Sequence, residues 1–179
     1  MPRPIHFAAP VALVALVLAG PPARADALLD ATAAIQRKDY PTAVRLLEPL
    51  ARAGNAAAQL RLAGLYYHGH GVRESDTLAQ QWYERAARQG LAEAQFQLGN
   101  MHAYGLAPAP ATDDPPRLAA QWYFEAARQG HAEAQYSLGI LFLTGSGVTQ
   151  SNAEARRWIE RAAAQGHPDA RAYLQGAAD

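Results

Sequence analysis

Apolar side chains recur along most of the chain at the three- and four-residue spacing of an amphipathic helix. One such segment begins at Ala134 and is followed by the break Gly145-Ser146-Gly147, after which a second segment ends at Gln165-Gly166. The apolar positions of the two segments are Ala134, Leu138, Leu141 and Phe142, and then Ala155, Trp158, Ile159 and Ala162. Ser151 or Asn152 can cap the second helix, and its closing glycine supplies a left-handed residue. The pattern predicts two helices joined by a short turn.

This helix hairpin is repeated along the chain. Residues 78–96 read LAQQWYERAARQGLAEAQF, and residues 118–136 read LAAQWYFEAARQGHAEAQY. A third copy, EARRWIERAAAQGHPDARA, covers residues 154–172, and a weaker copy, VRLLEPLARAGNAAAQL, covers residues 44–60. Equivalent tryptophans and glycines are 36 or 40 residues apart; they are Trp82, Trp122 and Trp158, and Gly54, Gly90, Gly130 and Gly166. A period of this length is typical of a repeat architecture.

One hairpin cannot bury its own apolar face, so neighbouring hairpins must stack into a solenoid. Small residues in the second helices let helix axes approach closely, and a tryptophan fills the space between layers. These small residues are the pairs Ala86-Ala87, Ala126-Ala127 and Ala162-Ala163. We expect one all-α domain over residues 26–179, and a final half unit from Pro168 to Gln175 that closes the last interface. The expected units are hairpins at about 26–54, 55–90, 91–130 and 131–166, and a half repeat at 167–179.

The recurring motifs follow one another in a fixed order. They are A-x-A-Q-x-x-L-G with an aromatic residue after it, then G-x-G-V, then W-Y-x-x-A-A in the second helix, and finally Q-G-H. This order resembles the Sel1-like repeat family, relatives of the tetratricopeptide repeat, over the chain from about Tyr40 to Leu174. The resemblance implies a right-handed superhelical α-solenoid of about four and a half repeats. It also implies a concave face lined by the first helices, and a role as an adaptor or assembly scaffold.

The second unit departs from the family pattern. His102 stands where the other units have Tyr66 and Phe142. A proline-rich stretch, residues 106–116, replaces the short G-x-G-V loop and is four residues longer. A loop of this composition is stiff and exposed, so it is either a tolerated insertion or an element that selects a partner.

The first residues have the organisation of a secretory signal peptide. Arg3 precedes an uncharged run from Ala8 to Gly20, and Ala23-Arg24-Ala25 offers an A-x-A cleavage site. The run is shorter than the roughly 20 residues that span a bilayer. We therefore interpret residues 1–25 as a cleaved signal, the alternative being a buried first helix. The expected product is periplasmic or secreted and has no stable membrane span.

Charge and cysteine content narrow the partners further. The chain has 16 basic and 16 acidic side chains, and two of the basic ones lie in the predicted signal. The remainder is slightly acidic and has no clustered basic face, which excludes nucleic acid as a partner. The chain has no cysteine, so it carries neither a disulfide framework nor a lipid attached through cysteine.

Histidine is the residue type that most invites a chemical role. His131 and His167 follow a helix-ending glycine, and Leu91 fills the same position in another unit, so we expect packing or capping there. The pair in His68-Gly69-His70 has no third ligand nearby, so no metal site is predicted. His102 falls on the interior face of its helix and is expected to be a core substitution. No catalytic constellation is evident, and we expect a protein that is not an enzyme and has no cofactor.

The remaining candidate site is the concave face that the family resemblance implies. Its aromatic and aliphatic groups form a possible groove for an extended peptide or a helix, while several of them can instead extend the core. The residues assigned to it by register are Leu60, Gly64, Tyr67, Glu93, Phe96, Asn100, Ala103, Tyr104, Glu133, Tyr136, Ile140 and Leu143.

These observations favour a non-catalytic scaffold or adaptor in the periplasm that binds a protein or peptide in this groove. Two other functions stay open. Some cysteine-rich exported members of the family are enzymes of the penicillin-binding or penicillin-hydrolysing type, although their hairpins are disulfide-linked. A role in carbohydrate binding or envelope assembly is also compatible with export and with a tyrosine-lined groove.

Overall fold

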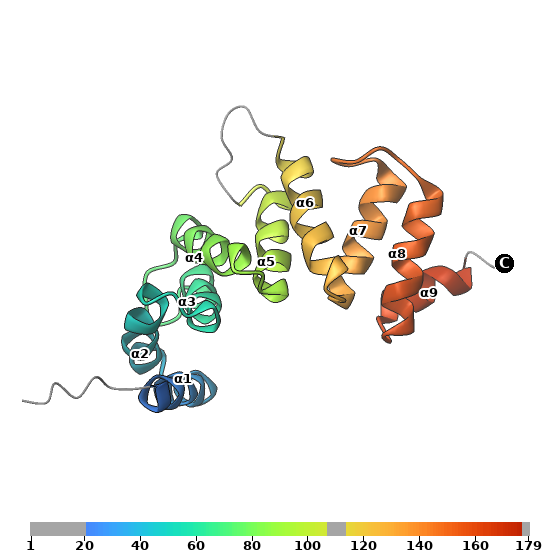
Figure 1. Ribbon diagram of the computed structural model, residues 1–179. Coiled ribbons are helices and arrows are strands. Elements are labelled where there is room, and N and C mark those ends of the chain that lie inside the picture. Colours follow the sequence, from blue (N-terminus) through green and yellow to red (C-terminus); the bar gives the residue numbers. More distant parts are fainter. Residues whose placement is uncertain (1–20, 107–113, 177–179) are drawn as a thin grey trace, which may run out of the picture.

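The fold was analysed in a computed structural model that describes residues 21–106 and 114–176. Every regular element in these residues is an α-helix, which confirms the predicted all-α class. The helices are α1 Pro21–Gln36, α2 Tyr40–Arg52, α3 Ala56–His68, α4 Asp76–Arg88, α5 Ala92–Ala103, α6 Pro115–Arg128, α7 Ala132–Thr144, α8 Asn152–Ala164 and α9 Pro168–Gly176. Figure 1 shows them following one another along a single array, with α1 and α9 at opposite ends.

Each helix packs chiefly against its neighbours in the chain, from α1 against α2 to α8 against α9. The array therefore has no central core and consists of a series of small clusters, as expected for a solenoid. We call α3, α5 and α7 the first helices of their units, and α4, α6 and α8 the second helices.

Alanine and glycine allow these helices to lie close together. Ala86 and Ala126, one from each of two successive second helices, are fully buried. A Cβ atom added at Gly99 would lie 2.6 Å from Cδ1 of Tyr123, so α5 and α6 are in direct backbone-to-ring contact. Of the tryptophans expected to lie between layers, Trp158 is buried, with 7% of its surface exposed.

Helix ends follow the local sequence. Ser151 caps α8 as predicted, because its Oγ accepts the backbone N–H of Glu154 at 3.3 Å. Gly166 follows the helix with φ +93°, a value that favours glycine. The G-x-G sequences are hairpin turns, as predicted, and at Gly147 an added Cβ would lie only 2.2 Å from the carbonyl oxygen of Pro116. The second glycine of this turn therefore lets the loop touch the start of α6.

The last helix closes the array as the sequence predicts. Ala170 of α9 is fully buried in a cluster with Ile159 and Ala162 of α8. Asp169 and Arg171 face solvent on the other side of α9. The final half unit thus covers the apolar surface that α8 would otherwise expose.

Two sequence-based predictions fall largely outside the described residues. Residues 1–20 of the predicted signal, and residues 107–113 of the long loop in the second unit, are not described. Among the described residues, no helix is both long enough and apolar enough to cross a membrane.

Candidate functional site

The predicted groove residues lie on three successive first helices and share intermediate exposure. Most of them are half-buried, whereas Ala103, Tyr104 and Glu133 are exposed. Tyr104, at the C-terminal cap of α5, is 74% exposed. By helix, the set is Leu60, Gly64 and Tyr67 on α3, Glu93, Phe96, Asn100, Ala103 and Tyr104 on or next to α5, and Glu133, Tyr136, Ile140 and Leu143 on α7.

Several of these side chains also stabilise the stack. Leu60 and Tyr67 pack against the buried cluster formed by α3, α4 and α5. Phe96 packs against the cluster of α6, α7 and α8, and Tyr136 against the last cluster. These four side chains thus extend the core, as the alternative interpretation expected, and their assignment to a groove stays a prediction.

Glu93 and Phe96 are brought together by a histidine from the next unit. His131 Nε2 lies 3.0 Å from Glu93 Oε2, and the imidazole stacks on Phe96 with centroids 4.7 Å apart. Its other nitrogen, Nδ1, accepts the backbone N–H of Ala134 at 3.2 Å and so caps α7. Since Nδ1 accepts, the hydrogen of a neutral ring is on Nε2 and is donated to the carboxylate.

This contact changes the pKa of Glu93. The hydrogen bond from His131 lowers the pKa of Glu93, against an opposing effect of burial, and a second bond from Gln97 lowers it further. Gln97 Nε2 donates to Glu93 Oε1 at 2.7 Å. The two bonds therefore favour the ionised form of Glu93, which accepts hydrogen bonds from its own helix and from the next unit.

The arrangement recurs one unit later. His167 caps α9 through Nδ1, which accepts the N–H of Ala170 at 3.3 Å. Its Nε2 lies 2.8 Å from Glu133 Oε2, and its ring stacks on Tyr136 at 4.5 Å. The predicted capping and packing role of both histidines is confirmed, and each also has an acidic partner that the sequence did not reveal.

Buried tyrosines of the second helices contact the first helices. The Tyr123 hydroxyl donates to Asn100 Oδ1 at 2.7 Å, and burial raises the pKa of Tyr123. Burial, followed by the charge of Glu93 and the nearby Tyr67, raises the pKa of Tyr83 to about 12. Asn100, assigned to the groove from its register, therefore has one polar atom already engaged in joining α5 to α6.

A ladder of glutamines, not foreseen from the sequence, runs through the units. In α5, buried Gln95 donates to the carbonyl of Ala87 at 3.1 Å and accepts from Gln129 at 2.7 Å. The equivalent bonds join Gln59 to Ala51 and Gln89, and Gln135 to Ala127 and Gln165. The recurring A-x-A-Q and Q-G motifs were the available signal. These hydrogen bonds are structural, because they join the helices of neighbouring units.

His68 and His70 form a second aromatic contact, at the end of α3, where His68 also meets Tyr67 edge-on with ring centroids 4.9 Å apart. His70 stacks on Tyr40 with ring centroids 4.3 Å apart, and His68 lies 5.5 Å from His70. No group of three potential ligands among histidine, cysteine, aspartate and glutamate is found in the described part of the chain. His102 is 5% exposed, which confirms it as a core residue.

The sequence also matches a known protein family. The sequence pattern of the Sel1 repeat matches residues 32–55, 56–91, 92–131 and 132–167. A curated relative, an exopolysaccharide production negative regulator from Rhizobium leguminosarum bv. viciae, is 32% identical over 142 residues. That match covers 74% of this chain and 53% of the relative, so the chain spans about half the length of the relative.

Solved structures show the same architecture. A Sel1 repeat protein from Oxalobacter formigenes is 35% identical with a TM-score of 0.72, over 81% of this chain and 56% of that one. The protein c5321, a protective antigen of uropathogenic Escherichia coli with an SLR fold, is 34% identical with a TM-score of 0.68, over 75% and 28%. Cysteine rich protein B of Helicobacter pylori, 20% identical with a TM-score of 0.51 over 82% and 96%, shares the fold alone.

Proposed function

Because the chain belongs to the Sel1 repeat family, we propose that it is a non-catalytic scaffold that binds a protein or peptide along its first helices. Repeats of this family generally mediate protein–protein interaction and mostly lack catalytic activity. The observation that carries the proposal is the row of half-buried aromatic and aliphatic side chains on α3, α5 and α7.

Two properties of this row suit a binding groove. Phe96 and Tyr136 are held by the stacked imidazoles of His131 and His167, so they lose little side-chain entropy when a partner covers them. Tyr104 is largely exposed and has the amphipathic character common in energetically important interface residues. An extended peptide or an amphipathic helix laid across the three helices would cover all three rings.

The groove is best tested at exposed positions, where a change leaves the stack intact. We expect Ala103→Glu combined with Tyr104→Ser to weaken binding of the partner about tenfold, because it removes a ring and adds a charge. The partner is first identified by cross-linking and mass spectrometry in the native envelope and then purified for titration. Tyr173→Ser on α9 is the matched control. Equal affinities of all three proteins would refute the groove, provided that circular dichroism shows unchanged helicity.

The periplasm is the proposed location, on the strength of the basic, apolar and A-x-A segments at the start of the chain. Protein isolated from the envelope fraction of its host should begin at Asp26, as measured by intact mass. A cytoplasmic product that retains the first residues would contradict export without affecting the groove.

A regulatory role in polysaccharide production is a second candidate, favoured by the curated relative that carries this function. In this case, the partner of the scaffold would belong to the machinery that makes or exports the polymer. Deleting the gene should then raise extracellular polysaccharide, and the groove variant should fail to restore the original level. Unchanged polysaccharide in the deletion strain would remove this candidate.

A further inference from the structure

In two of the second helices, α4 and α8, the guanidinium of an arginine lies over the ring of a tryptophan from the same helix. In α4, the guanidinium of Arg85 lies 4.4 Å from the ring centroid of Trp82. In α8, the guanidinium of Arg161 lies 4.5 Å from that of Trp158. In both units, the arginine follows the tryptophan by three residues, and the cation lies within the distance at which a ring attracts it.

The equivalent surface of α6 is built differently. Glu125 stands three residues after Trp122, at the position that arginine occupies in α4 and α8. Phe124 stands where α4 and α8 carry the acidic residues Glu84 and Glu160, and its side chain is 41% exposed. Among the described residues, the arginine contact seen at the other two tryptophans is not found at Trp122, and the anionic Glu125 lines a depression together with Trp122 instead.

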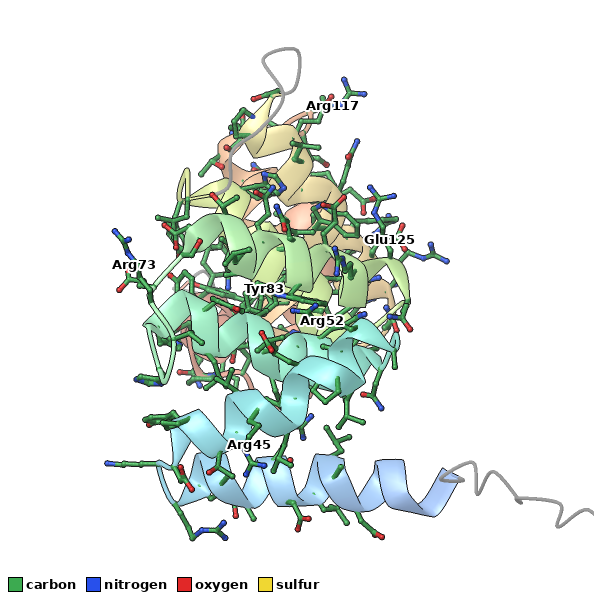
Figure 2. The ribbon with its side chains drawn as sticks, turned by 90° about the vertical axis from the view of Figure 1, so that its left-hand side faces the viewer. Arg45, Arg52, Arg73, Tyr83, Arg117 and Glu125 are labelled. Atoms are coloured by element: carbon green, nitrogen blue, oxygen red, sulfur yellow. The ribbon has the colours of Figure 1, made fainter. Side chains whose placement is uncertain are left out.

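Two adjoining depressions mark this surface. The first, about 320 Å³, is lined by Gln121, Trp122, Phe124 and Glu125. The second, about 230 Å³, shares Gln121 and Phe124 with the first and is otherwise bounded by Arg117 and Ala120 of α6 and by groups of α7 and the loop after it. Figure 2 shows Glu125 at the outer edge of the molecule, away from Tyr83, which lies among the helices.

We propose that this outer surface of α6 binds a segment of a partner protein that carries an arginine or lysine next to an apolar residue. The cation lies over Trp122 beside the Glu125 carboxylate, and the apolar side chain enters the second depression against Phe124. The chain itself shows what the tryptophan accepts, because Arg85 and Arg161 fill the same position on equivalent rings. Glu125 supplies the charge complementarity that selects a basic partner.

The present partner of Glu125 does not prevent this. Arg128 lies 3.6 Å from Glu125 on the same helix, and both side chains are about half exposed or more. An exposed pair of this kind contributes little free energy, so an incoming cation can share or replace it. Arg128 also lies 5.8 Å from the centroid of Phe124.

The surface is tested with the peptide acetyl-Leu-Arg-Leu-amide, and with a peptide in which neutral citrulline replaces arginine. The protein has three tryptophans, so the indole N–H signals in a ¹⁵N spectrum report on the three second helices separately. We expect a saturable shift of the Trp122 signal with the arginine peptide, and about tenfold weaker binding of the citrulline peptide. Equal shifts of all three signals, or equal affinity for both peptides, would overturn the proposal.

One variant should remove the proposed site on α6, and another should create an equivalent site on α4. Glu125→Arg gives α6 the residue found in α4 and α8, so the fold should persist while peptide affinity falls about tenfold. Arg85→Glu should create a second site, seen as a new shift of the Trp82 signal. Wild-type binding by Glu125→Arg would refute the assignment. The groove variant Ala103→Glu/Tyr104→Ser should bind the peptide normally, so this test and that of the groove can fail independently.

Discussion

At the scale of single residues, His131 and His167 each contact a helix end, a carboxylate and an aromatic ring. His131 caps α7, donates to Glu93 and stacks on Phe96. In an earlier unit, Asn55 performs only the capping, since its Oδ1 accepts the N–H of Ala58 at 2.9 Å. Capping the helix and bonding to the preceding unit are therefore separate roles. Asparagine provides the cap alone, whereas histidine provides both.

The acid-side stability of the protein should depend on Glu93. Its pKa is lowered in the folded state, so its stabilising effect is present above the pKa of the unfolded chain and is lost as pH falls through the folded pKa. Glu93→Gln should therefore be less stable than wild type at pH 7, by about 0.5 kcal/mol at this half-exposed site, and the difference should shrink towards pH 3. Urea unfolding midpoints across this range measure the effect.

His131→Asn provides the matched background for this prediction. Asparagine retains the cap, as Asn55 does, but removes the hydrogen bond that is the largest cause of the lowered pKa. In that background, Glu93→Gln should alter the pH dependence much less. A pH dependence that is the same in both backgrounds would show that the contact with His131 contributes no stability.

Some of these residue roles could be predicted from the sequence. The structural role of His131 followed from Leu91, which fills the equivalent position and cannot act as a base or ligand. The contact between Glu93 and His131 did not follow, because it joins residues 38 apart whose separation in space depends on how two units stack. The same limit applies to the glutamine ladder.

At the scale of helices, spacing of the first and second helices is set by residues without large side chains. Gly99 faces the ring of Tyr123, whereas an added Cβ at Gly64 would lie an ordinary 3.7 Å from the hydroxyl of Tyr83. Helix positions, turns and the Ser151 cap could be predicted from period and local chemistry. The exposure of Phe124 could not, since it depends on the neighbouring unit.

Two glycine substitutions should have opposite effects on stability. Gly64→Ala should stabilise the protein by about 0.5–1 kcal/mol, because alanine favours the helix and meets no close contact. Gly99→Ala should destabilise it by about 1–2 kcal/mol, because the new methyl group presses on Tyr123 within a packed helix pair. Chemical denaturation of both variants measures the difference. Stabilisation by Gly99→Ala would mean that α5 and α6 can separate at little cost.

At the scale of the whole molecule, packing between neighbours makes stability depend on position in the array. Central helices pack against a helix on each side, whereas α9, at the end of the described array, packs chiefly against α8. The all-helical solenoid was predictable because the sequence period reports it directly. The partner was not predictable, since members of the family share a fold and differ in the side chains on its surface.

Central and terminal members of the hydrogen-bonded ladder should therefore respond differently. Gln95→Leu removes the side-chain hydrogen bonds to Ala87 and from Gln129, although the carbonyl of Ala87 keeps the backbone N–H of Gly90, and should cost about 1–2 kcal/mol of global stability. Arg171→Ala removes the last such bond, to Ala163, and should mainly accelerate amide exchange in α9. Urea unfolding and hydrogen exchange distinguish the two. As a control, Leu at exposed Gln81 should change stability by less than about 0.5 kcal/mol.

The ladder also has a direction. Gln95 donates back to Ala87, Tyr123 back to Asn100, and Arg171 back to Ala163, so each donor lies later in the chain than its acceptor. A chain that emerges from a ribosome or a translocon with its N-terminus first therefore presents acceptors before their donors arrive. Each of these bonds can therefore form only after the later of its two residues has been made.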